Sequence, residues 1–164
     1  MIITNDYLLE AMNELKRLEH IIYVSLKYTR TTDVITNALK RLLEIFDLVI
    51  EAFLEKAKEE NLIASLPKSP ALRATRLGEI HSEDKILNDY LHFYQFLKNV
   101  LKSPYGKRQE FRRHVTLIVE FENSTAEANI DNLSNCERYV QGFFNYASKI
   151  IEGPQEDEEN SEEN

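Results

Sequence analysis

Cysteine, glycine and proline are all scarce in this chain. Its 164 residues include one cysteine, Cys136, with four glycines and four prolines. One cysteine excludes an internal disulfide and a cysteine-rich zinc site. Four isolated glycines exclude a phosphate-binding loop of the P-loop or dinucleotide type. The shortage of helix breakers, together with many Leu, Ile, Lys and Glu residues, favours long helices.

Long apolar runs are also missing. No stretch approaches the roughly 18 apolar residues of a membrane span. Polar residues such as Asn5, Asp6 and Glu10 interrupt the apolar ones near the N-terminus, unlike the apolar core of a signal peptide. We therefore expect a cytoplasmic protein that keeps its thiol reduced and does not contact a membrane.

The net charge of −8 belongs mostly to one end of the chain. Seven of the 28 acidic residues lie between Glu152 and the last residue, a stretch without Lys or Arg. The rest of the chain is nearly balanced, with 21 acidic and 20 basic residues. Residues 154–164 are predicted to be a disordered acidic tail, because they carry no apolar side chain to bury. The tail either keeps the protein soluble or covers a basic segment of the same chain as a mimic of nucleic acid.

Apolar residues recur at three- and four-residue steps, as expected for helices with one buried face. The strongest stretch is 33–61, with Thr32 or Asp33 as its capping residue. The expected long helices are 5–28, 33–61, 82–102 and one that opens at a Ser134–Glu137 capping box and closes at Gly153. A short helix is expected over 70–77, between Pro70 and Gly78. The sequence therefore predicts a mainly α fold, a helical bundle over residues 1–153.

The period changes after the turn at residues 103–106. Apolar and polar residues alternate over 115–121 and again over 126–131, and a polar link joins the two stretches. This pattern predicts a β-hairpin at about 114–131, with His114 at the start of its first strand. An isolated hairpin is barely stable in water, so we expect it to lie on the helices or to pair with another chain.

Two common kinds of active site lack their residue patterns. The chain contains no Glu-x-x-His sequence of the kind that binds metal in carboxylate-bridged bundles. Cys136 lies near a helix start, but no nearby base is evident that would activate it. The expectation is therefore that the protein holds no metal and no cofactor.

The most distinctive segment is 98–114, where basic residues greatly outnumber the single acid, Glu110. Cations and interleaved aromatic rings of this kind can bind phosphates and stack a base. The candidate nucleic-acid-binding residues are Lys98, Lys102, Tyr105, Lys107, Arg112 and Arg113. Arg73 and Arg76 would extend this patch if the short helix lies nearby. The alternative interpretation is a solvated cluster of charges beside a helix.

Arg108 and His114 in the same segment are separated by five residues, and the polar Gln109 follows the arginine. This spacing resembles the motif of the HEPN class of helical bundles. The resemblance implies a metal-independent ribonuclease that works across a dimer. In that case His114 would act as a general base on the ribose 2′-hydroxyl, and Arg108 would stabilise charge on the phosphate.

Three functional hypotheses follow. The first is a non-enzymatic protein-interaction or regulatory module, expected to form a homodimer through its apolar helix faces. The second is the HEPN-like ribonuclease or RNA-binding protein that uses segment 98–114. The third is a module that binds a protein partner by adding a strand to the exposed edge of the hairpin.

Overall fold

The structure is a computed structural model that describes residues 2–153. Its helical elements are α1 (Asp6–His20), the π-helix η1 (Ile21–Ser25), α2 (Leu26–Tyr28), α3 (Thr32–Glu59), α4 (Pro70–Ile80), α5 (Lys85–Lys102) and α6 (Ile130–Glu152). The strands are β1 (Tyr105–Arg108), β2 (Thr116–Glu120) and β3 (Thr125–Ala128). The fold is thus mainly helical, with one small antiparallel sheet. The predicted acidic tail, 154–164, lies outside the described residues.

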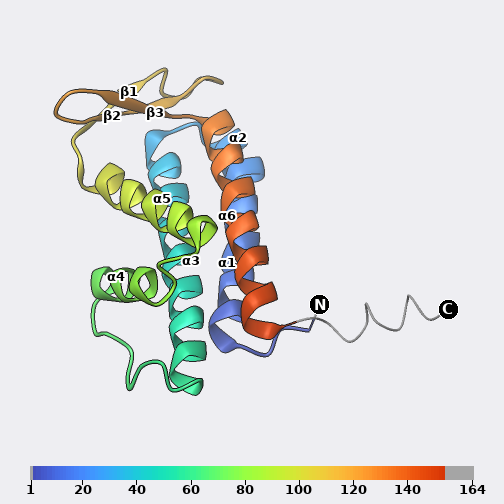
Figure 1. Ribbon diagram of the computed structural model, residues 1–164. Coiled ribbons are helices and arrows are strands. Elements are labelled where there is room, and N and C mark those ends of the chain that lie inside the picture. The colour runs from blue at the N-terminus through green and yellow to red at the C-terminus, as the bar shows by residue number, and fades with distance from the viewer. Residues whose placement is uncertain (1, 154–164) are drawn as a thin grey trace.

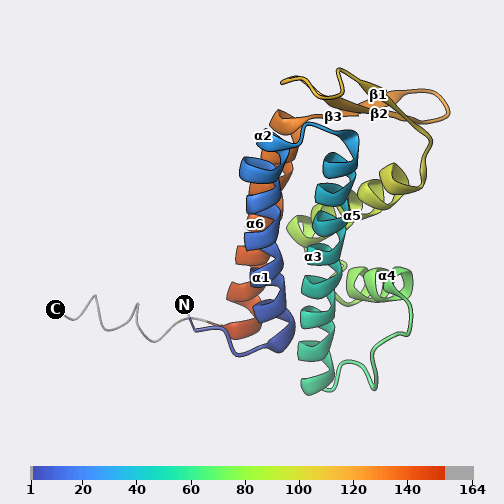
Figure 2. The same cartoon turned by 180° about the vertical axis from the view of Figure 1, so that it is seen from behind.

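Helices α1, α3 and α6 lie side by side, and α3 separates α1 and α6 from α4 (Figures 1 and 2). Helix α5 crosses this body obliquely and leads to the sheet. The sheet covers one end of the helices, where α2 ends and α6 begins (Figure 1). Elements far apart in sequence therefore meet at this end of the molecule. They are the C-terminal end of the first helix, the loop between β1 and β2, and the N-terminal end of α6.

The core follows the apolar stripes of the sequence. Helix α3 supplies its centre, where Phe46 is fully buried and stacks on Phe143 of α6 at a centroid distance of 5.0 Å. Burial of one such side chain contributes about 1.5–3 kcal/mol. The apolar side chains Leu8, Leu15 and Leu18 complete the packing from α1.

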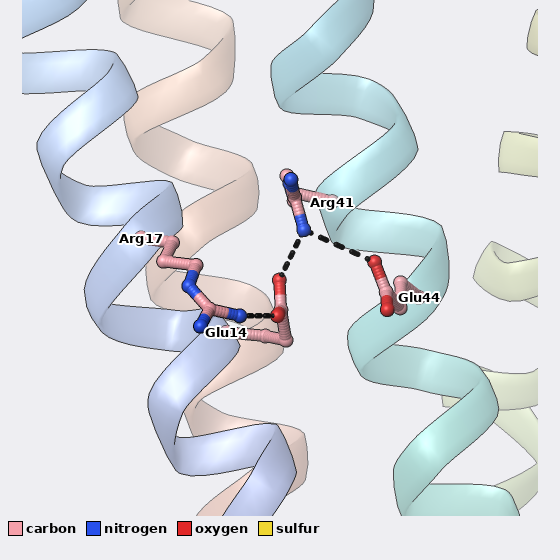
Figure 3. A network of polar contacts seen from close by, with 4 residues as sticks. All are labelled: Glu14, Arg17, Arg41 and Glu44. Atoms are coloured by element: carbon pink, nitrogen blue, oxygen red, sulfur yellow. Dashed lines mark hydrogen bonds and ion pairs between the residues drawn. The ribbon is translucent and has the colours of Figure 1, made fainter.

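One carboxylate is buried between α1 and α3. Glu14 is 2% exposed, and its two oxygens accept hydrogen bonds from Arg17 on the same helix and from Arg41 on α3, the latter at 2.9 Å (Figure 3). Arg41 also donates to Glu44 at 3.4 Å. A buried charge without a partner costs several kcal/mol, so these two arginines make the burial of Glu14 tolerable and connect α1 to α3.

Several helix boundaries differ from the predicted ones. Thr31, one residue before the expected candidates, caps α3 by accepting the amide of Val34. Helix α4 continues through Gly78 to Ile80, and it packs closely against α5, since a Cβ on Gly78 would lie 3.4 Å from Asn88 Oδ1. Asp84 rather than Ser82 caps α5, accepting the amide of Leu87 at 3.0 Å.

The predicted opening of α6 at Ser134 is wrong. Asn129 caps the helix by accepting the amide of Asn132 at 3.0 Å, so α6 begins one turn earlier, at Ile130. Ser134 lies inside the helix, where its hydroxyl donates to the carbonyl of Ile130 at 2.9 Å. The side chain of Asn129 satisfies a free amide as a serine would, and the capping-box pattern did not detect it.

The sheet has three strands in the order β1-β2-β3. The first two residues of β1, Tyr105 and Gly106, were predicted to be part of a turn. The strand pairs with β2 so that Tyr105 lies opposite Val119 and Arg108 opposite Thr116. The structure therefore has a three-stranded sheet in place of the predicted two-stranded hairpin at 114–131, and residues 130–131 belong to α6. Leu117, Val119 and Ala128 are buried on the face that covers the helices. His114 is in a turn before β2, not in a strand.

None of the helices between residues 2 and 153 is both long and apolar enough to cross a bilayer.

Candidate nucleic-acid interface

The first helix changes its hydrogen bonding as it approaches the sheet. In η1 the amide of Leu26 donates to the carbonyl of Ile21, five residues back, which is the π-helical pattern. Ile21 and Leu26 stay buried, while Tyr23 is half exposed. The helix then ends at Tyr28, so Lys27, Tyr28 and Arg30 lie at the sheet end of the molecule.

The loop of residues 109–115, between β1 and β2, is fixed to the start of α3. The amide of Phe111 donates to the carbonyl of Arg30 at 2.7 Å. Glu110 Oε1 accepts from both the amide (3.1 Å) and the hydroxyl (2.6 Å) of Thr32, at the first residue of α3. These hydrogen bonds lower the pKa of Glu110, the bond from the Thr32 hydroxyl most strongly. An acid is favourable at this place, because a helix N-terminus carries partial positive charge.

The same loop holds a large aromatic ring in solvent. Phe111 is 78% exposed and has a left-handed backbone with φ of 66°, and Gln109 has φ of 55°. A non-glycine residue in this region costs about 1–2 kcal/mol. Such a conformation persists where its surroundings impose it. The hydrogen bonds to Arg30 and Thr32 impose it here. Strain at an exposed ring is typical of functional sites, not of packing.

A depression of about 580 Å³ opens between the end of the first helix, this loop and the start of α6. Its volume is within the range of ligand pockets, about 300–1,000 Å³. One side of it is basic and aromatic. It is lined by Tyr23, Leu26, Lys27, Arg30, Arg113, His114, Val115, Ile130, Asp131 and Ser134.

A second depression, of about 420 Å³, lies directly beside the first. Lys27, Tyr28, Thr29, Arg30 and Phe111 line it. Two of these residues, Lys27 and Arg30, line both depressions, so the two are adjacent. Seven side chains of the two depressions are cationic, aromatic or imidazole, and we name them the basic–aromatic surface: Tyr23, Lys27, Tyr28, Arg30, Phe111, Arg113 and His114.

The cations of this surface form no ion pairs. Lys27, Arg30 and Arg113 contact no carboxylate of any residue between 2 and 153. They therefore lie beside exposed rings and are available to a ligand. A polyanion with flat, stackable groups matches both features.

Part of this surface was predictable from the sequence. Of its candidate residues, Arg113 and His114 line the larger depression, and Arg112 is exposed in the same loop. Lys98, Lys102, Tyr105 and Lys107 line neither depression. Lys98 lies over the ring of Tyr94 at 5.2 Å, and Lys107 is 3.9 Å from Glu110.

Arg108 and His114 do not line a common depression. The Arg108 guanidinium donates to Glu127 Oε1 on β3 at 2.8 Å. That hydrogen bond raises the pKa of Arg108 and lowers the pKa of Glu127. Arg108 thus has a carboxylate partner on the sheet, while His114 lies at the basic–aromatic surface.

Arg73 and Arg76 do not extend the surface either. Arg73 joins α4 to α3 through Glu51 at 2.9 Å and donates to the Pro67 carbonyl at 2.8 Å. Arg76 pairs with Glu79 on the same helix at 3.1 Å. Helix α4 lies beside α3 at a distance from the sheet (Figure 2).

The sequence did not predict the part of the surface that comes from the first helix, which is Tyr23, Lys27, Tyr28 and Arg30. A signal is present, because Lys27, Tyr28 and Arg30 combine two cations and a ring at the expected end of this helix. These residues lie far in sequence from the basic segment 98–114, so only the fold brings the two together.

A second cluster of titratable groups lies between α3 and α5, without a cavity. The Tyr94 hydroxyl donates to Asp47, and burial raises the pKa of both groups. Residues 2–153 contain no group of three or more His, Cys, Asp or Glu side chains that could hold a metal ion.

Comparison with protein-family models, with curated proteins and with solved structures finds no match to this chain. The site itself therefore carries the functional argument.

Proposed function

We propose that this protein is a non-enzymatic binding module and that its ligand is single-stranded RNA, held on the basic–aromatic surface. The observation that supports this proposal is the set of unpaired cations, Lys27, Arg30 and Arg113, around exposed rings. Cations that serve the fold elsewhere in the described residues, such as Arg41 and Arg73, have carboxylate partners.

The cations supply affinity for the phosphate backbone. When Lys or Arg binds a phosphate, counterions are released from the nucleic acid, so affinity falls as salt rises. For single strands log K falls with log salt with a slope of about 0.7 per phosphate contact. Lys27 and Arg30 line both depressions and Arg113 lines the larger one, so all three cations lie on the surface that we propose holds one strand.

The rings favour a single strand over a duplex. Tyr28 is 80% exposed and Phe111 is 78% exposed, and both line the smaller depression. An aromatic ring stacks on the face of a base, and in a duplex both faces are already occupied by neighbouring bases. Stacking of this kind contributes about 1–3 kcal/mol per base.

Fluorescence anisotropy with a labelled ten-nucleotide uridine RNA tests the proposal. The full chain is expected to bind at low salt and to lose affinity as salt rises. The double variant Lys27→Ala, Arg113→Ala removes two phosphate contacts, so the slope of log K against log salt should fall by about 1.4. DNA of the same length, titrated in parallel, separates a general single-strand site from one that requires ribose.

The matched control is Lys68→Ala, Arg76→Ala, which removes the same charge near α4 and should leave the slope unchanged. Equal slopes for the two double variants would contradict the proposal. A poly-glutamate peptide that displaces RNA and binds equally well to Phe111→Ala would show an acidic protein segment to be the ligand instead.

Metal-independent RNA cleavage is a second candidate, because His114 lies on the same surface as the unpaired cations. It predicts that RNA is cut in the presence of a chelator and that His114→Ala abolishes cutting while binding is retained. The HEPN-like pairing with Arg108 predicts the same loss for Arg108→Ala. RNA that is bound but never cut would exclude both.

The homodimer and the protein partner also stay predictions. The edges of the sheet, β1 and β3, are four residues long each. Charged residues on an edge strand oppose strand addition, and Lys107 and Arg108 occupy half of β1. Light scattering at high concentration measures the oligomeric state directly.

A further inference from the structure

The larger depression has two chemically opposite sides. Lys27, Arg30 and Arg113 are cations, whereas the wall formed by the first turn and a half of α6 carries Asp131 and Ser134. A site for phosphate alone would not include a carboxylate, because like charges repel. The acidic wall must therefore face a part of the ligand other than phosphate.

Asp131 is free to contact a ligand. Its side chain is exposed, and its carboxylate forms no hydrogen bond or ion pair with another residue of the described chain. Its place in the first turn of α6 favours a negative charge, because the helix N-terminus carries partial positive charge. A carboxylate of this kind only accepts hydrogen bonds.

Ser134 adds a second acceptor to the same wall. The single hydroxyl hydrogen of Ser134 is donated to the carbonyl of Ile130 at 2.9 Å. The oxygen keeps its acceptor capacity, so the wall offers acceptors and no side-chain donor. Its complement is a group with two N–H bonds, such as the exocyclic amino group of a base.

We propose that Asp131 gives this depression a preference for a base with an exocyclic amino group, such as cytosine, over uracil. This inference rests on the proposed function. Lys27 and Arg30 line both depressions, so a strand with a phosphate over them would have one base in the smaller depression, beside Tyr28 and Phe111, and the next base in the larger one, beside Asp131. Stacking in the smaller depression accepts any base. The acidic wall selects among bases by the hydrogen bonds of their edges.

Cytosine and uracil make the sharpest comparison, because they have the same size and ring. The cytosine amino group donates to a carboxylate, whereas uracil presents a carbonyl oxygen at that position, which a carboxylate repels. The full chain is expected to bind ten-nucleotide cytidine RNA about ten-fold more tightly than uridine RNA. Asp131→Asn supplies both a donor and an acceptor at nearly the same size, so the ratio should fall to about one, mainly through tighter uridine binding.

Asp6→Asn is the matched control, since Asp6 is an exposed aspartate in the first turn of α1, at the other end of the molecule. It should leave the cytidine-to-uridine ratio at about ten. The preference is overturned if the wild-type chain binds both RNAs equally, or if Asp131→Asn keeps the wild-type ratio, while the dependence on Lys27 and Arg113 is intact. Failure to bind either RNA overturns the proposed function, and the inference with it.

Discussion

Two groups of charged residues in this protein differ in whether they have partners of opposite charge. Between α1 and α3, Glu14 is buried and both neighbouring arginines donate to it (Figure 3). At the sheet end, Lys27, Arg30 and Arg113 surround two depressions and none has an acidic partner among residues 2–153. The charges of the first group are paired within the protein, and the charges of the second group are not.

The difference separates charges that are neutralised inside the fold from charges that we propose to bind a ligand. A buried carboxylate must be neutralised within the molecule, because desolvation would otherwise outweigh the gain from folding. Exposed cations cost little on their own, because water solvates them. We therefore expect substitutions in the first group to change stability and substitutions in the second to change binding.

Glu14→Ala should have the largest effect on stability. It leaves Arg41, whose side chain is 35% exposed, without its interhelical partner. We expect a loss of about 2–3 kcal/mol in the free energy of unfolding, less than the roughly 3–5 kcal/mol of a fully buried pair. Urea denaturation measures this. Glu44→Ala removes only the exposed half of the network and should cost less than about 1 kcal/mol. Equal losses for the two variants would contradict the distinction.

Phe111→Gly should separate stability from binding. Glycine adopts the left-handed φ of this position without the cost of about 1–2 kcal/mol that other residues bear, although its flexible unfolded state offsets roughly half of that. The variant is expected to gain up to about 1 kcal/mol of stability and to lose about 1–3 kcal/mol of RNA affinity. Phe111→Ala keeps the strained backbone. It should therefore lose the same RNA affinity without any gain in stability. A Phe111→Gly variant that is less stable than wild type would mean that the ring packs against the fold.

Glu110→Ala should have the smallest effect, and it depends on pH. The folded pKa of Glu110 is lowered by its hydrogen bonds from Thr32, so its contribution to stability is full above the unfolded value of 4.5. That contribution is lost as pH falls through the lower folded pKa. The stability difference between wild type and variant should therefore shrink below pH 4.5. If the stability difference between wild type and Glu110→Ala is the same at pH 3 and pH 7, the charge of Glu110 does not contribute to stability. Glu83→Ala, at an exposed site before α5, is the control.

The helices were predictable because their signal is local and repeated. The stripe along α3 sets its burial, since each apolar residue one turn further on lies on the same face. The boundaries were less predictable because several side chains can cap a helix. Asn129, Thr31 and Asp84 took that role in place of Ser134, Thr32 and Ser82.

The site was only half predictable for a different reason. Arg113 and His114 are neighbours in sequence and could be found together. Lys27 and Arg30 join them through tertiary contacts, the hydrogen bonds from the Phe111 amide to the Arg30 carbonyl and from Thr32 to Glu110. Strand β1 was missed because Tyr105 and Gly106 follow a proline and resemble a turn. Its pairing with β2 fixes where the loop starts, and therefore where Arg113 lies.

The π-helical turn at Ile21–Ser25 amounts to one residue more than an α-helix of the same length needs. Because each residue advances an α-helix by about 100°, this surplus residue turns everything after it relative to everything before it. The buried stripe of α1 and the exposed side chains of Lys27 and Tyr28 thus follow separate phases within one continuous helix. A change at the exposed end of this helix therefore need not disturb the spacing that its buried stripe must keep.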